Sequence, residues 1–184
     1  MKYAKTLGII ISFFWITAAN AGVFEVGGTF SWTRSNYNAG SYTWTRAYGS
    51  TFGYYFTQDS ELEFSYQDST TKNYVAGVED ISYRDRVYSI NMLYHLFEEN
   101  SAFRPFFRIG VGQLNRDATG TYSAAGYSAP GRLDSVSVIG GLGFKLKITQ
   151  KVSIKTEATS YLTGGSIGSW QDNLSFNIGG AFYF

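Results

Sequence analysis

The chain has 184 residues, of which 18% are aromatic and 21 are glycine, with 2 prolines and no cysteine. Its formal net charge is only +1, and a chain without a basic excess is a poor candidate for binding nucleic acid. The lack of cysteine excludes a disulfide framework, so a core or a membrane must hold the fold together.

Residues 1–21 have the pattern of a secretory signal peptide: a basic start at 1–5, an apolar run at 7–16 and an Ala-x-Ala site at 19–21. The apolar run is about ten residues long, which is too short for a helix that spans a bilayer. We therefore expect cleavage after Ala21 and a single mature domain at 22–184. Loss of Lys2 and Lys5 leaves 15 − 2 = 13 basic residues against 14 acidic ones, a net charge of −1.

Eight segments of the mature chain alternate between large apolar residues and small or polar residues with a period of two. This alternation predicts β-strands that have one apolar face. The segments are about 23–33, 42–56, 61–68, 84–96, 103–113, 134–148, 152–162 and 174–184. Polar loops at 36–40, 69–81, 114–133 and 163–172 alternate with short turns at 57–60, 98–101 and 149–151. Segments of about ten residues, joined by alternating short and long connections, are typical of a transmembrane barrel.

The apolar face decides between a soluble barrel and a membrane barrel. Eight strands enclose a space that side chains just fill, so the many large aromatic residues cannot all point inward. They must face lipid, with aromatic residues gathered at both rims. One rim is expected to hold Trp32, Trp44 and Tyr88, and the other Phe24, Phe56, Tyr94 and Phe184. The sequence therefore predicts an all-β fold, an eight-stranded antiparallel up-and-down transmembrane β-barrel, rather than a soluble barrel such as a lipocalin.

The last segment closes the predicted barrel by pairing with the first one near Val23. Its ending resembles the C-terminal insertion signal of bacterial outer-membrane barrels, here Phe176, Ile178, Phe182 and Phe184. The mature chain as a whole resembles the small barrels typified by the OmpA transmembrane domain and OmpX, notably at 104–112 and 138–144. This resemblance implies a Gram-negative outer membrane, recognition by the insertion machinery, and four external loops. Both chain ends would then lie on the periplasmic side.

Charged residues also occur on the inward face of the predicted strands. They are Glu25, Glu61, Glu63, Arg104, Arg108, Lys145, Lys147, Lys155 and Glu157. An unpaired charge in a narrow interior is costly, so these side chains need partners. We predict a lumen ion-pair network centred on Glu63, Arg108, Lys145, Lys155 and Glu157 that blocks free diffusion. The alternative is a narrow porin-like channel for ions or small solutes.

A third alternative is a lipid A-modifying barrel enzyme, in which a histidine acts with a serine. The one histidine, His95, has no His-x-Ser pattern around it and is expected at the periplasmic rim. We therefore expect no enzyme, no catalytic residue and no cofactor. Glu79, Asp80 and Asp85 resemble an ordinary solvated cluster, and without cysteine or a second histidine no transition-metal site is expected.

The expected partners follow from this architecture. They are outer-membrane lipid and lipopolysaccharide around the barrel, and a ligand on a host or neighbouring cell surface at the loops. Loops on a rigid scaffold commonly carry binding. Loop residues that offer aromatic contact surface are Tyr37, Tyr42, Tyr74, Tyr122, Tyr127 and Trp170. We expect a monomer with a structural or surface-interaction role.

Overall fold

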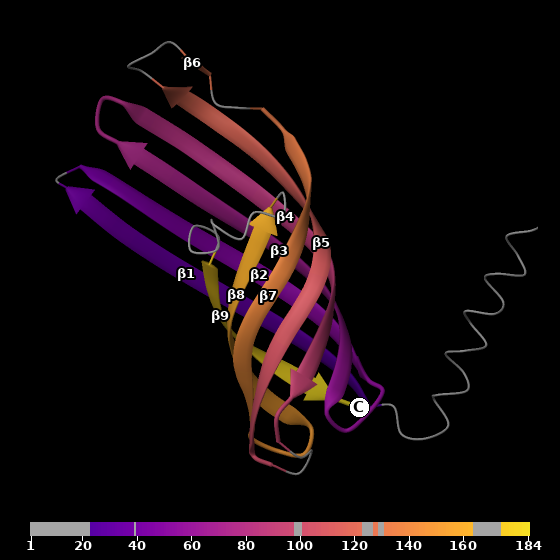
Figure 1. Ribbon diagram of the computed structural model, residues 1–184. Helices are drawn as coiled ribbons and strands as arrows, with labels where there is room; N and C mark the ends of the chain where they lie inside the picture. Colours follow the sequence, from indigo (N-terminus) through magenta and orange to yellow (C-terminus); the bar gives the residue numbers. More distant parts are fainter. Residues whose placement is uncertain (1–22, 39, 98–100, 123–126, 129–130, 164–173) are drawn as a thin grey trace, which may run out of the picture.

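The computed structural model describes residues 23–38, 40–97, 101–122, 127–128, 131–163 and 174–184 (Figure 1). The expected signal peptide and Trp170 lie outside these ranges. Within them, no helix is long and apolar enough to cross a membrane.

Eight long strands form the fold, and each is antiparallel to its neighbours. They are β1 Val23–Asn38, β2 Ser41–Tyr55, β3 Ser60–Val75, β4 Glu79–His95, β5 Phe103–Tyr122, β7 Leu133–Lys147, β8 Val152–Thr163 and β9 Leu174–Tyr183. A two-residue strand, β6 (Tyr127–Ser128), pairs with the end of β5. Because β9 pairs back onto β1, the sheet closes, and the predicted up-and-down barrel is confirmed.

The start of β1 meets the last residue of the chain where the barrel closes. The backbone amide of Phe24 donates to the carbonyl of Phe184 at 3.1 Å, and the amide of Phe184 donates to the carbonyl of Phe24 at 3.0 Å. At the other end of the contact, the last β1–β9 pair is Phe30 opposite Ile178, although β1 continues to Asn38. The wall is therefore paired at the end that carries the start of β1, the end of β9 and the short turns, which we call the short-turn end.

The strands are strongly tilted. Following cross-strand partners from Phe24, near the start of β1, leads around the barrel to Leu174 at the opposite end of β9. The intermediate partners are Tyr54, Leu62, Met92, Ile109, Gly140 and Ser160. Each row of partners thus rises from one end of the barrel toward the other, as closure of a tilted sheet requires.

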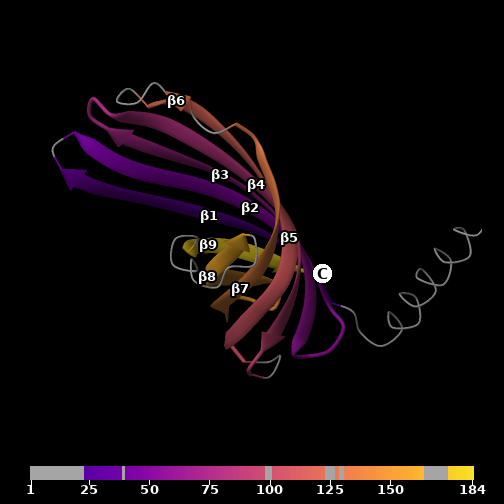
Figure 2. The ribbon, with the colours of Figure 1, turned by 45° about the horizontal axis from the view of Figure 1, so that its top comes forward.

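Several strands run further than the sequence pattern indicates. The predicted loop at 69–81 is mostly strand, because β3 reaches Val75 and β4 begins at Glu79, and β5 extends to Tyr122. Polar cross-strand pairs hold these extensions, including Thr43–Asn73 at 2.8 Å and Thr45–Thr71 at 2.9 Å. Their paired β1–β5 sheet continues past β8 and β9 at what we call the long-strand end (Figures 1 and 2).

The outward face carries the large apolar side chains, as predicted. On β1 the exposed series runs from Phe24 through Val26 and Phe30 to Trp32, which is 62% exposed. The four residues of the predicted insertion signal, Phe176, Ile178, Phe182 and Phe184, all lie on this face. The interior holds most of the buried charged and polar side chains, together with a smaller apolar cluster. A large apolar face turned outward is the reverse of a soluble barrel and fits a barrel surrounded by lipid.

Candidate functional site

The lumen is filled in layers, and the inward residues of β3 give their order along the barrel. From the short-turn end these residues are Glu61, Glu63, Ser65, Gln67, Ser69 and Thr71. Each of the first four belongs to a separate layer of side-chain contacts across the lumen. The last two line an open cavity.

The first ionic layer is centred on Lys145 of β7. Its Nζ donates to Glu25 Oε2 at 2.6 Å, to Glu61 Oε2 at 2.8 Å and to the Tyr55 hydroxyl at 2.8 Å. Tyr55 in turn donates to Glu25 Oε2 at 2.9 Å. Because the lysine and both carboxylates are at most 1% exposed, this cluster ties β7 to β1, β2 and β3 through the middle of the barrel.

The second ionic layer lies one inward position further along β3. Glu63 accepts hydrogen bonds from Arg108 Nη2 and from Lys155 Nζ, both at 2.6 Å. Glu157 lies 2.9 Å from Arg108 and 3.4 Å from Lys155. The layer thus connects β3, β5 and β8. Four of the five residues predicted to form one network meet here, whereas the fifth, Lys145, belongs to the first layer.

Aromatic residues close the short-turn end below the ionic layers. His95 Nε2 lies 3.2 Å from Glu61 Oε2, and its ring packs between those of Tyr55 and Phe106, at centroid distances of 5.5 and 5.6 Å. Arg104 reaches over the Tyr55 ring and donates to the backbone carbonyl of Gln58 at 2.6 Å. In the described part of the chain, no serine hydroxyl hydrogen-bonds to His95.

Two smaller layers lie beyond the ion pairs. Ser65 and Ser89 share a hydrogen bond of 2.5 Å, and Asn91 donates to Ser65 at 3.0 Å. The next layer is apolar: Val87, Leu114 and Ile139 form a buried cluster, against which Tyr161 packs while its hydroxyl donates to Gln67. Sequence alternation places Val87 inward, but it assigned Leu114 to a loop and did not reveal the apolar floor that both residues form with Ile139.

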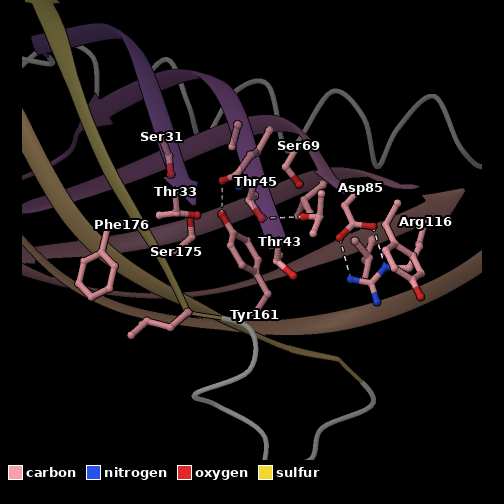
Figure 3. A pocket seen from close by; sticks show the side chains of 17 residues that line it. Ser31, Thr33, Thr43, Thr45, Ser69, Asp85, Arg116, Tyr161, Ser175 and Phe176 are labelled. Atoms are coloured by element: carbon pink, nitrogen blue, oxygen red, sulfur yellow. Dashed lines mark hydrogen bonds and ion pairs between the residues drawn. The ribbon is translucent and has the colours of Figure 1, made fainter. Parts of the chain in front are cut away.

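Above this floor lies a cavity of about 320 Å³, which we call the vestibule. Hydroxyl side chains line it, among them Ser31, Thr33, Thr43, Thr45, Ser69 and Thr71 (Figure 3). A bidentate ion pair between Arg116 and Asp85, with both bonds at 2.7 Å, lies on one side of it. Leu174 and Phe176 of β9 border the vestibule near the place where β1 and β9 stop pairing.

Two residues of the acidic cluster noted in the sequence form ion pairs: Asp85 pairs with Arg116, and Asp80 pairs with Lys72 at 3.2 Å. Across the described residues, no group of three or more histidine, aspartate or glutamate side chains is placed to hold a metal ion. The polar groups that line the lumen are engaged mainly with one another.

The protein-family model for the OprF membrane domain matches residues 1–181 of this chain. The chain belongs to the OprF membrane domain family. The match covers nearly all of the chain, so it is an outer-membrane β-barrel of the small type, as the sequence resemblance implies. Comparison with curated proteins gave no significant match.

Solved structures of small barrels share this fold. The N-terminal barrel domain of Pseudomonas aeruginosa OprF is 19% identical, with a TM-score of 0.57 over 89% of this chain and 100% of that one. OprG from Pseudomonas aeruginosa is 17% identical, with a TM-score of 0.58 over 89% and 96%. Ail, the attachment invasion locus protein of Yersinia pestis, is 12% identical, with a TM-score of 0.53 over 89% and 97%. At these identities the likeness supports the fold alone.

Proposed function

We propose that this chain is a structural barrel of the outer membrane whose lumen is closed to solutes, and that its external strands and loops make its surface contacts. The observation that carries the proposal is the stack of ionic layers. Lys145 crosses the lumen to Glu25 and Glu61, and immediately beyond it Arg108 and Lys155 converge on Glu63.

Energetics support a closed lumen. To let a hydrated solute through, these side chains would have to separate and leave buried charges without partners. Breaking one buried pair costs about 3–5 kcal/mol, and these ion pairs share their carboxylates, so several contacts would be lost together. The apolar layer of Val87, Leu114 and Ile139 adds a second barrier, because hydrophobic constrictions in a narrow pore expel water.

The surface role is supported by the long-strand end, which is the external end of a barrel with short periplasmic turns. The β1–β5 sheet continues past β8 and β9 there (Figure 1). Its polar strand ends are held by side-chain pairs such as Thr43–Asn73. Tyr42 and Tyr74 also stack across β2 and β3 with ring centroids 5.3 Å apart. A rigid, polar platform of this kind suits contacts with other molecules at the cell surface.

A narrow channel is the second candidate, and one observation favours it. Glu25 Oε1, Glu61 Oε1 and His95 Nδ1 are buried without a hydrogen-bond partner among the described residues. Water that satisfied these atoms would form part of a path for small ions near the short-turn end. The enzyme alternative has no comparable support within the described residues, since His95 contacts Glu61 and two rings, and its Nδ1 has no serine hydroxyl as a partner.

Liposome swelling separates the closed barrel from the channel. Liposomes that contain the purified mature chain should swell in an isosmotic solution of a small sugar no faster than protein-free liposomes, because the ionic layers exclude hydrated solutes. Liposomes with an open porin at the same protein-to-lipid ratio give the positive control. Swelling at a rate that rises with the amount of folded chain would contradict the closed lumen.

A further inference from the structure

The outward face of β1 and β2 has a shallow hollow just beyond the apolar belt. It is lined by Trp32, Arg34, Trp44 and Arg46 and has a volume of about 290 Å³. In the strand register Trp32 lies opposite Arg46, and Arg34 lies opposite Trp44. The hollow is therefore a cross-strand square in which two tryptophans and two arginines occupy alternating corners.

The two arginines differ from the other cationic side chains near this end of the barrel. Arg84 pairs with Asp68, Arg86 with Asp117, Arg116 with Asp85, Arg132 with Asp134, and Lys72 with Asp80. Neither Arg34 nor Arg46 has a carboxylate partner among the residues that the structure describes. Among the described residues near this end, the sheet thus gathers two positive charges without carboxylate partners in one place and pairs the other five cations.

Aromatic rings hold both guanidinium groups in position. Arg46 lies over Trp44 and Tyr48, at 5.9 and 5.5 Å from their ring centroids, and Arg34 lies 5.3 Å from the centroid of Tyr42. Arg34 has five N–H donors, of which the Nε–H donates to Asn36 Oδ1 at 3.3 Å. Within the described residues most donors of the pair remain available to an anion, and stacking reduces the entropy lost when they bind one.

The position of the hollow indicates where such an anion would come from. Phe30 and Tyr48, the outward residues next along β1 and β2 toward the short-turn end, are 44% and 52% exposed and belong to the lipid-facing belt. Tryptophan at such a boundary is typical of the headgroup level of a membrane. In an outer-membrane barrel with short periplasmic turns, the long-strand end is external, so the hollow lies at the level of the outer leaflet. A ligand in the hollow would therefore have an anionic head beside the arginines and an apolar part along the belt.

We propose that the Trp32–Arg34–Trp44–Arg46 hollow binds the phosphate group of an outer-leaflet lipid. Phosphate suits the site because it accepts charge-assisted, bidentate hydrogen bonds from arginine. The apolar surface of the same lipid packs on Trp32 and Phe30. This site lies on the outward face and does not depend on whether the lumen is closed, so the two proposals are tested independently.

Tryptophan fluorescence can test this site. A chain that starts at residue 22 and carries Trp170→Phe keeps only Trp32 and Trp44, both in the hollow. In phosphatidylcholine vesicles, addition of bis-phosphorylated lipid A should change its emission saturably, whereas lipid A without phosphates should not. The double variant with Arg34→Gln and Arg46→Gln should need at least about tenfold more lipid A for half-saturation, because the charge-assisted bonds are lost.

The matched control is Arg84→Gln in the same Trp170→Phe background, since Arg84 also faces outward on the same sheet but is already paired with Asp68 at 2.6 Å. It should leave the response unchanged, and all variants are compared as folded barrels on unheated gels. An unchanged response in the double variant, or an equal response to dephosphorylated lipid A, would overturn the site. Competition by millimolar inorganic phosphate would assign it to the free anion and overturn the lipid proposal.

Discussion

Replacing Lys145 with methionine should lower the free energy of unfolding by about 3–5 kcal/mol, the range for breaking a buried ion pair. Methionine is similar in length to lysine, so packing changes little, but Glu25 and Glu61 lose the cation between them. Both carboxylates are at most 1% exposed and cannot recover their solvation. Urea unfolding in lipid vesicles, followed by the mobility difference between heated and unheated samples on gels, measures the change.

Lys72→Met is the control, because Lys72 pairs with Asp80 at 3.2 Å where both side chains are partly exposed, by 33% and 53%. An exposed pair contributes about 0–1 kcal/mol, so this variant should unfold close to the wild type. Adding Glu25→Gln and Glu61→Gln to Lys145→Met should restore part of the lost stability by removing the unpaired charges. Equal unfolding midpoints for Lys145→Met and Lys72→Met would show that the first ionic layer does not hold the barrel together.

Deletion of Phe184 should reduce the amount of folded barrel in the outer membrane more than any single substitution on the outward face. Phe184 makes two backbone hydrogen bonds with Phe24, and their rings stack with centroids 6.0 Å apart. The deletion therefore removes the last closing contact of the barrel as well as the terminal residue of the predicted insertion signal. The folded fraction is measured in outer-membrane extracts as the band whose mobility changes on heating.

Phe103→Ala provides the comparison for this deletion. Phe103 is also an exposed aromatic residue at the short-turn end, 45% exposed, but it lies on β5 and not at the closing contact. It should reach the outer membrane at nearly the wild-type level. If the deletion and Phe103→Ala reduce folded protein equally, the special role of the C-terminal strand in insertion would be refuted.

The sequence predicted the parts of the fold that depend on alternation. Phe24, Val26, Phe30 and Trp32 recur every second or fourth residue, and that periodicity reports directly on which face meets lipid. The pattern fades where a strand leaves the membrane, because both faces then meet water and neither needs to be apolar. The ends of β3, β4 and β5 were therefore underestimated, and only their cross-strand pairs show that they remain strands.

The lumen was predictable as a set of residues but not as an arrangement. Alternation assigns Glu63 and Lys145 to the interior, but their partners depend on strand tilt. Because each row of partners rises around the barrel, Lys145 lies at the level of Glu25 and Glu61, whereas Lys155 meets Glu63. The hollow on β1 and β2 was missed for a related reason: Arg34 and Arg46 become neighbours of Trp44 and Trp32 only through the β1–β2 register.

Planar-bilayer recording of the purified mature chain tests most directly the claim that the ionic layers close this barrel. After incorporation of protein that is fully folded by gel mobility, a closed lumen should give a baseline current like that of the protein-free bilayer, with no steady steps across the voltage range. An open porin incorporated in the same way shows that the method detects pores. Steady, large conductance steps whose number grows with the amount of folded chain would show that the lumen is open.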